Sequence, residues 1–257
     1  MAIFNRDVFG NIVVLKRVLI SLIGMLTFPS FSWLNKTKIE GTEHFENLPK
    51  TKILFVSNHQ TYFADVIAFV HVFCSVKWKF RNSISNPVYL LNPVTNTSFI
   101  AAQETMKEGI IPKIFAYAGS LQVKRTWREA GKSISRQVEV SEFSVIEKAL
   151  DSGWVITFPQ GTTTPFAPGR RGTTHIIKQY KPIVIPVVIN GFREAFDKRG
   201  MRLKKRGMEL SIKFKAPLEI DYEADSAQLL AQIMEAIEQN QAFQEADAAK
   251  KEKAAVA

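Results

Sequence analysis

The sequence predicts an α/β fold in which helices flank a sheet that is mostly parallel, with a mixed edge allowed. Short apolar runs of strand length alternate along the chain with longer segments of helical periodicity. The run at residues 183–189 is apolar throughout, as expected for a central strand that is covered on both faces. Apolar residues make up 46% of the 257 residues, which is enough for the core of one large domain.

Residues 1–34 are predicted to form an apolar N-terminal helical region, which Lys16 and Arg17 interrupt. The uninterrupted part, residues 18–28, is much shorter than the roughly 20 residues that cross a bilayer. Basic and aromatic residues flank this part, a composition typical of a helix that lies in a membrane interface. A helix that packs on the protein's own core fits these features equally well, so both interpretations stay open.

The predicted strands are short apolar stretches bounded by polar residues, Gly or Pro. In chain order they are 53–56, 99–102, 121–123, 154–158, 183–189 and 209–214. A polar segment at residues 35–45 precedes them and has room for one more short strand. This regular return of strand-like runs is the basis for a single sheet.

The predicted helices share apolar residues that recur at helical spacing. In chain order they are 65–73, 135–150, 173–180 and a last helix that starts near residue 225. Asn, Pro, Ser and Thr punctuate residues 75–98, which predicts an irregular insert with a short helix at 88–91. Residues 106–117 are expected to form a helical or turn segment, because Gly109 and Pro112 interrupt the pattern.

Residues 35–244 are therefore predicted to form the main domain, and residues 245–257, rich in Ala, Lys and Glu, a disordered tail. Lys and Arg number 34 against 24 Asp and Glu, a net charge of +10. Such a surface suits nucleic acid, anionic lipid or acidic substrates. The single cysteine, Cys74, excludes a disulfide framework and argues against a cysteine-based metal site.

The most informative stretch is residues 52–65. The predicted strand 53–56 runs into His59 at its carboxyl end, which is where open α/β sheets form their sites. Asp65 follows after five intervening residues (60–64), where the next helix begins. A histidine with a carboxylate nearby is the arrangement of a general base and its orienting group. The same residues also fit a histidine held in a turn and an aspartate that caps a helix.

Two further polar clusters follow short strands. Lys124 and Arg125 come after the run 121–123. A turn dense in glycine and hydroxyl groups comes after the run 154–158, and its candidate residues are Gln160, Gly161, Thr162 and Thr163. In a mostly parallel sheet all three clusters open at one edge. A base, two cations and such a turn suit transfer chemistry on a phosphorylated alcohol, with backbone N–H groups near the glycine for a developing oxyanion.

Four segments, in order, resemble the four motif blocks of the glycerolipid acyltransferase family, which includes the 1-acylglycerol-3-phosphate acyltransferases. They are Asn58-His59 with Asp65, Val123-Lys124-Arg125, Phe158-Pro159-Gln160-Gly161-Thr162 and Ile185-Pro186-Val187-Val188. The resemblance covers roughly residues 35 to 220. One block alone is weak evidence, whereas four in order at plausible separations are specific.

The resemblance implies a role for each matching residue. His59 is the general base that deprotonates the acceptor hydroxyl, and Asp65 fixes its tautomer and stabilises the imidazolium. Arg125, with Lys124, binds the acceptor's phosphate or another acidic headgroup. The turn at Gly161 belongs to the acceptor or oxyanion site. The family needs no metal or other cofactor, and its acyl donor is a thioester on coenzyme A or on acyl carrier protein.

Two departures from the family pattern affect these expectations. The first block is one residue longer than usual between its His and its Asp, which a loop can absorb. The third block usually reads Phe-Pro-Glu-Gly-Thr-Arg, whereas Gln160 and Thr163 stand here in place of the Glu and the Arg. Either the acceptor headgroup differs from a simple phosphate, or Arg170 and Arg171 supply the missing cations.

The function implied by this resemblance is transfer of a fatty acyl group to the free hydroxyl of lysophosphatidic acid, which gives phosphatidic acid. The alternative acceptor is a lyso-aminolipid or another lysophospholipid. The expected partners are the lipid acceptor, the acyl thioester and a membrane surface, with the protein peripheral or monotopic on the cytoplasmic face. A different class, a non-catalytic basic module that binds membrane or nucleic acid, is disfavoured because the basic residues are dispersed and no nucleic-acid motif occurs. No metal site is expected, since the remaining histidines share no ligand-like spacing.

Overall fold

The computed structural model describes residues 5–103, 109–123, 128–129, 132–133 and 140–256. Its centre is a seven-stranded sheet in the order β1-β9-β8-β2-β7-β3-β4. The strands are β1 (Lys36–Glu40), β2 (Ile53–Ser57), β3 (Thr97–Ala102), β4 (Ser120–Val123), β7 (Trp154–Thr157), β8 (Ile183–Asn190) and β9 (Glu209–Phe214). Neighbouring strands are parallel except for β8 and β9, so the mostly parallel sheet with a mixed edge is confirmed. A separate antiparallel pair consists of β5 (Arg128–Glu129) and β6 (Lys132–Ser133).

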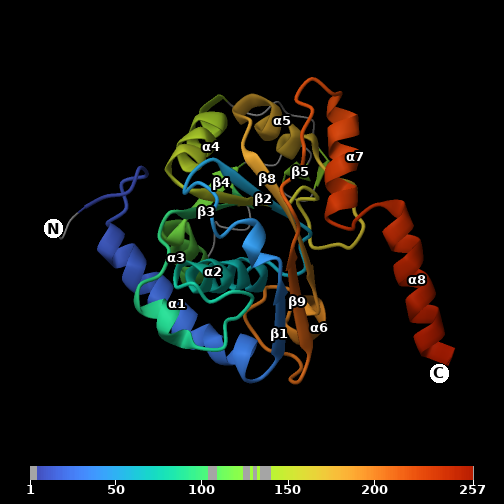
Figure 1. Cartoon of the computed structure of the whole chain (residues 1–257), viewed down its shortest axis with the longest axis horizontal. Coiled ribbons are helices and arrows are strands. Elements are labelled where there is room, and N and C mark those ends of the chain that lie inside the picture. Colours follow the sequence, from blue (N-terminus) through green and yellow to red (C-terminus); the bar gives the residue numbers. More distant parts are fainter. Residues whose placement is uncertain (1–4, 104–108, 124–127, 130–131, 134–139, 257) are drawn as a thin grey trace.

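Helices cover both faces of the sheet (Figure 1). One face carries α1 (Val13–Ser32), α2 (Ala64–Lys77) and α3 (Ile110–Ala118). The other face carries α4 (Val140–Ser152), α5 (Arg171–Tyr180) and α7 (Ser226–Ala236). The short helices are η1 (Thr42–His44), η2 (Pro87–Leu91) and α6 (Phe192–Ala195). The last helix, α8 (Gln241–Val256), extends away from the body of the protein.

Alternation along the buried strands divides the core into two layers. On β2, Ile53 and Phe55 belong to the cluster under α1, α2 and α3. Leu54 and Val56 belong to the cluster under α4, α5 and α7. All four side chains are fully buried. An uninterrupted apolar run therefore fills both layers, which is why such runs indicate central strands.

Most predicted elements are present with shifted ends. α2 continues to Lys77 rather than ending at residue 73. The segment 106–117 contains α3, and the insert 75–98 contains η2. The start of the predicted helix 135–150 lies outside the described residues, and α4 is described from Val140.

The prediction of a disordered tail at 245–257 is corrected by the structure, in which residues 245–256 continue helix α8. Ala, Gln, Glu and Lys dominate this segment and are strong helix formers. The side chain of Asn240 accepts a hydrogen bond from the N–H of Phe243 at 3.2 Å, near the start of the helix. Gln241 also donates to Glu245 one turn later, at 2.9 Å. A low apolar content argues against packing, but it does not argue against a helix.

α1 lies within the predicted helical region 1–34 and, within the described part of the chain, is the helix that is long and apolar enough to cross a membrane. It nevertheless packs along the domain through a buried stripe that recurs about once per turn, consisting of Lys16, Ile20, Gly24, Phe28 and Phe31. Asp7 neutralises the buried lysine, with the Lys16 Nζ atom 3.2 Å from the Asp7 Oδ2 atom. Burial lowers the pKa of Lys16, and the nearby Asp7 carboxylate opposes that shift. The side of α1 that faces away from the domain is apolar and exposed.

Candidate active site

The strongest candidate site lies at the carboxyl ends of β2 and β7, as expected for an open α/β sheet. His59 follows the end of β2, and Asp65 is the second residue of α2. The Nδ1 atom of His59 lies 2.8 Å from the Oδ2 atom of Asp65. The Asp65 side chain is fully buried, whereas the His59 side chain is 13% exposed. The structure thus brings together the two residues that the sequence predicts as a base and its orienting carboxylate.

The loop between His59 and Asp65 closes around the carboxylate. Asp65 accepts hydrogen bonds from the backbone N–H of Gln60 at 2.6 Å and of Thr61 at 3.1 Å. The Thr61 hydroxyl donates to the other carboxylate oxygen, Oδ1, at 2.7 Å. The loop thus accommodates five residues between His59 and Asp65, one more than the family pattern has, and still brings the carboxylate to the imidazole. Because the carboxylate accepts from every neighbour, the Nδ1 atom of His59 carries the proton of their shared bond, which leaves Nε2 as the basic atom.

An aromatic ring fixes the plane of the His59 imidazole. Phe158, the first residue after β7, stacks on it with a ring-centroid distance of 4.0 Å and an interplanar angle of 21°. Phe158 stands in the third motif block, and no role was predicted for it. The feature that indicates its contact with His59 is its position directly after β7, the strand that pairs with β2.

Side-chain amides anchor the loop that follows β2, residues 58–63, to the end of β8. The Asn58 side chain donates to the carbonyl of Ile189 and accepts from its N–H, both at 2.8 Å. The Oε1 atom of Gln60 accepts from the N–H of Phe192 at 2.9 Å and of Arg193 at 3.3 Å. The residues on both sides of His59 are therefore tied to the segment that follows the central strand.

A second support is a basic hairpin, residues 195–204, closed by a hydrogen bond from the Lys204 N–H to the Ala195 carbonyl at 2.7 Å. Carbonyl groups of this hairpin accept from the N–H groups of Tyr62 at 3.1 Å and Phe63 at 3.0 Å. Gly200, at φ +74°, lies so close that a Cβ there would overlap the backbone N of Ala64. Sequence reasoning missed this support, and a glycine inside a basic segment was its only signal.

The turn after β7 is built partly on its own hydrogen bonds. Gly161 has φ +62°, and its N–H donates to the Phe158 carbonyl at 2.9 Å. Gln160 is buried, and its amide nitrogen donates to the Ala167 carbonyl at 2.9 Å and to the Gln239 side chain at 3.1 Å. This geometry gives Gln160 a structural role in the turn, so its predicted contact with a substrate stays a prediction.

The hydroxyl and basic residues of this region separate into different surroundings. The hydroxyl of Thr162 lies 3.2 Å from that of Thr164. Thr163 is buried, and its carbonyl accepts from the Nη2 atom of Arg193 at 2.6 Å. The N–H of Arg170 donates to the Pro159 carbonyl at 2.8 Å, and Arg171 is the exposed first residue of α5. The predicted cations Lys124 and Arg125 lie outside the described residues.

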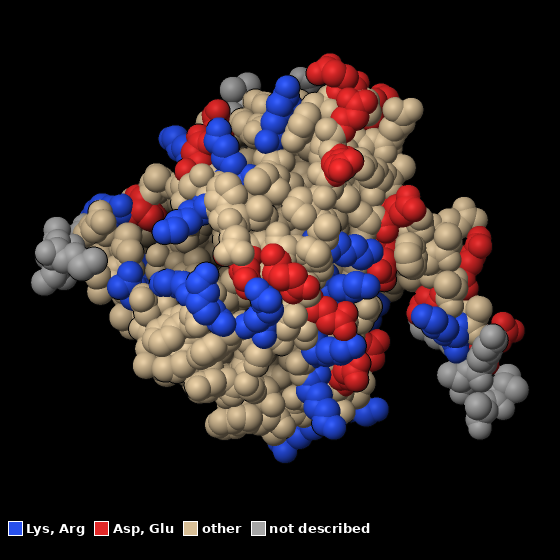
Figure 2. All heavy atoms as spheres, viewed as in Figure 1, with Lys and Arg blue, Asp and Glu red and all other residues tan. Residues whose placement is uncertain are grey.

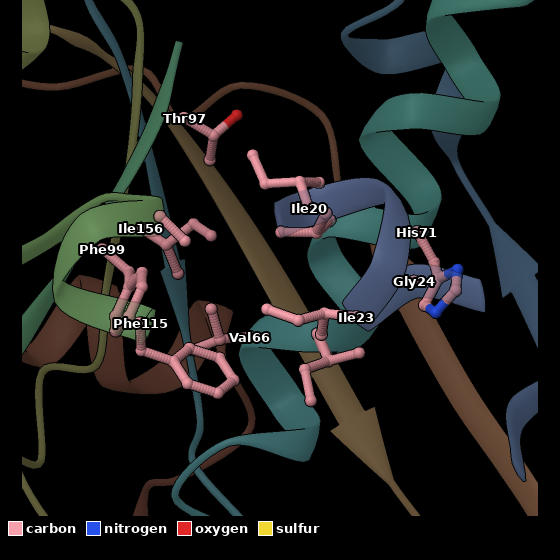
Figure 3. A pocket seen from close by; sticks show the side chains of 12 residues that line it. Ile20, Ile23, Gly24, Val66, His71, Thr97, Phe99, Phe115 and Ile156 are labelled. Atoms are coloured by element: carbon pink, nitrogen blue, oxygen red, sulfur yellow. The ribbon is translucent and has the colours of Figure 1, made fainter. Parts of the chain in front are cut away.

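An apolar cavity of about 40 Å³ lies between α1, α2, α3 and the sheet. One of its lining residues, Val66, directly follows Asp65 in the chain. Figure 3 shows Ile20 and Ile23 of α1 across from Phe115 of α3 and Ile156 of β7. The hydroxyl of Thr97 is buried at its edge with no hydrogen-bond partner among the described residues.

Burial holds two titratable groups of α2 uncharged. His71 contacts the Tyr89 hydroxyl at 2.8 Å and the Thr27 hydroxyl at 3.0 Å, and burial lowers the pKa of His71 to about 3. Burial likewise raises the pKa of the Cys74 thiol to about 11, which makes it a poor nucleophile. The described residues contain no group of three or more His, Cys, Asp or Glu side chains suited to a metal.

Comparisons with known proteins concern both the sequence and the fold. A family model described as Acyltransferase matches residues 36–190, more than half of the chain. The fold is similar to the crystal structure of the 1-acyl-sn-glycerophosphate acyltransferase PlsC from Thermotoga maritima, with a TM-score of 0.55 and 18% sequence identity. The likeness covers 90% of this chain and 80% of that one, and at such identity it shows a shared fold alone. No curated protein matches the chain.

Proposed function

The chain belongs to the acyltransferase family, and from this premise we propose that it moves a fatty acyl group from a thioester to the free hydroxyl of lysophosphatidic acid. The product is phosphatidic acid. The observation that carries the proposal is the His59–Asp65 pair, with 2.8 Å between Nδ1 and Oδ2, at the carboxyl edge of the sheet. The fold shared with a protein named as a 1-acyl-sn-glycerophosphate acyltransferase supports this class of acceptor.

In the proposed reaction, Nε2 of His59 takes the proton of the acceptor hydroxyl while the hydroxyl oxygen attacks the thioester carbonyl. A new C–O bond forms, the C–S bond breaks, and the imidazolium returns the proton to the departing thiolate. Asp65 holds the Nδ1–H, so that Nε2 faces the acceptor, and its charge stabilises the imidazolium. The acceptor oxygen is itself the nucleophile, so the reaction needs no acyl-enzyme, no metal and no cofactor other than the thioester of coenzyme A or acyl carrier protein.

The apolar cavity is the place where the acyl chain is proposed to lie. It starts beside Val66 and Phe115, close to Asp65, and its lining is almost entirely apolar. Its volume of about 40 Å³ is far smaller than a fatty acyl chain, so binding requires the seam between α1 and α3 to widen. A chain-length series of acyl donors tests this placement. Filling the cavity with Ala118→Leu is expected to shift the preference to shorter chains.

The exposed side of α1 is proposed to rest in the membrane, with the protein monotopic on the cytoplasmic face. Leu26 is 80% exposed, Trp33 71% and Leu91 of η2 64%. Figure 2 shows a broad surface without charged groups over α1 and η2, with Lys and Arg side chains along its border. Such an apolar face with a basic border is typical of interfacial helices. Vesicle sedimentation tests this, because Leu26→Glu is expected to release the protein into the supernatant.

The test of the chemistry is His59→Ala in the purified, folded protein, with lysophosphatidic acid and acyl-coenzyme A as substrates. Removal of a positioned base is expected to lower the rate by about 10²–10⁴. His175→Ala is the matched control, because that histidine is exposed on α5. A rate within a few-fold of wild type for His59→Ala contradicts the assignment of the base. A wild-type protein without any acyl transfer favours the non-catalytic basic module instead.

A second acceptor is favoured by the turn after β7. Gln160 and Thr163 leave the turn without the carboxylate and the guanidinium that the family pattern has there. Gln160 is moreover engaged with Ala167 and Gln239. A lyso-aminolipid or another lysophospholipid is therefore the alternative acceptor. A panel of acceptors at equal concentration decides between the two, since the preferred acceptor has the highest kcat/KM.

A further inference from the structure

Arg193 places a cation at the turn where Thr163 has no charge. Its Nη2 atom donates to the Thr163 carbonyl at 2.6 Å. Arg193 belongs to the short helix α6, which directly follows β8 and Gly191. Arg193, which follows the fourth motif block in the sequence, therefore brings its positive charge to the turn of the third block, residues 160–163.

The backbone of Arg193 is fixed beside the loop that follows β2. Its N–H donates to Gln60 Oε1 at 3.3 Å, and Gln60 is the residue after His59. Its carbonyl accepts from Lys204 Nζ at 2.6 Å. The preceding Phe192 is fully buried, which anchors α6 in the core. Among the residues that the structure describes, Arg193 is the cation bonded both to the loop after His59 and to the turn after β7.

The guanidinium of Arg193 retains capacity for an anion. It is half-buried, and within the described part of the chain no carboxylate pairs with it. A guanidinium has five N–H donors in a planar fork that matches carboxylate and phosphate oxygens. The Thr163 carbonyl uses one of these donors and orients the rest. A half-buried cation without a counter-ion, held between the two segments that flank the base, is suited to an anionic ligand.

We propose that Arg193 binds the anionic headgroup of the acceptor and so determines the preference for a charged acceptor. This proposal rests on the proposed acyl transfer, and it names the residue that recognises the acceptor in that same site. The headgroup anion is a phosphate or a carboxylate, the two groups that the guanidinium fork fits.

The kinetic test compares lysophosphatidic acid with a monoacylglycerol of the same acyl chain, which lacks the phosphate. Arg193→Gln removes the charge and keeps an amide that can donate to the Thr163 carbonyl. We expect kcat/KM for lysophosphatidic acid to fall about 10- to 100-fold, the range of a hydrogen bond to a charged group, mainly through KM. Turnover of monoacylglycerol is expected to stay within about three-fold, and Arg193→Lys to recover part of the loss.

Lys205→Gln is the matched control, because it removes one exposed charge just beyond the basic hairpin. An equal loss of kcat/KM for both acceptors means that Arg193 only stabilises the turn through Thr163, and it overturns the proposal. An unchanged kcat/KM for both acceptors overturns it as well.

A binding arm separates this proposal from the proposed acyl transfer. The dissociation constant of glycerol 3-phosphate is measured for the wild type and for Arg193→Gln. A weakening of about 10-fold or more supports the role of Arg193 even if the wild type transfers no acyl group. No weakening, or no binding to the wild type, overturns it.

Discussion

Replacing Asp65 by Asn tests the roles proposed for the His59–Asp65 pair. The amide group keeps one acceptor oxygen and turns the other into a donor. With the oxygen at the Oδ2 position, it still accepts from His59 and from the N–H groups of Gln60 and Thr61. The new NH₂ group then faces the Thr61 hydroxyl, which can rotate to accept, and the Thr61 N–H, which loses its bond to Oδ1 but keeps the one to the oxygen at Oδ2. This orientation satisfies every neighbour, so the asparagine keeps the His59 tautomer and loses only the charge.

The size of the effect follows from that charge. In the proposed reaction the Asp65 carboxylate stabilises the imidazolium, and a hydrogen bond to a charged group contributes about 1.5–3 kcal/mol, so loss of the charge is expected to lower kcat about 10- to 100-fold. Asp65→Ala removes the tautomer control as well and leaves several donors without an acceptor. Its rate is expected to fall about 10²–10⁴-fold, and each unsatisfied buried donor costs about 1–3 kcal/mol of the free energy of unfolding.

The assay is steady-state acyl transfer by both variants, with denaturant unfolding in parallel. A rate for Asp65→Asn within two-fold of wild type refutes the role of the charge. Equal rates for the Asn and Ala variants refute the argument that the asparagine preserves the tautomer.

Three other predictions concern the surroundings of the pair. Gly200→Ala is expected to lower the free energy of unfolding by about 2–4 kcal/mol and to reduce activity, because its Cβ collides with Ala64. Gly207→Ala is the control, because Gly207 has a similar φ and open space around it. It is expected to cost about 1 kcal/mol in the same denaturant titration. The folded-state pKa of His71, about 3, lies below its unfolded value of about 6.5, so the unfolded chain binds more protons between these values. Stability therefore decreases as the pH is lowered through that window. Between pH 6.5 and 5 the loss is about 2 kcal/mol, and unfolding titrations at both pH values should show a smaller loss for His71→Gln. Thr97→Val is expected to raise the free energy of unfolding by about 1 kcal/mol, because it replaces a buried hydroxyl that has no partner among the described residues, and an unchanged or lower denaturation midpoint contradicts this.

Local features of the chain were predictable and long-range ones were not. His59 and Asp65 are six positions apart, so a strand end followed by a helix start is enough to bring them together. Gln60 and Arg193 are 133 positions apart, and only the pairing of β2 with β8 makes them neighbours. No periodicity or motif spacing contains that information, so nothing in the sequence pointed to Arg193, and the role predicted for Arg170 and Arg171 stays a prediction.

The same limit applies to the turn and to the end of the chain. Gln160 is predicted as a substrate contact because it occupies a motif position, and the sequence does not reveal that its amide also bonds Ala167 and Gln239 in the folded chain. The last residues looked disordered because they lack an apolar stripe, yet their intrinsic helix propensity is high. An apolar stripe predicts that a helix packs against a core. A segment without such a stripe can still be helical when its residues have high helix propensity.

The basic hairpin holds the loop after His59 mainly through main-chain atoms. The carbonyl groups of Lys198 and Arg199 and the bare Cα of Gly200 make the contacts, and the side chains of Lys198 and Arg199 are exposed. Because the Lys198 ammonium also lies over the Tyr62 ring, 5.9 Å from its centroid, Arg199 is the exposed side chain of this pair whose charge can change while the hydrogen bonds that hold the loop stay in place.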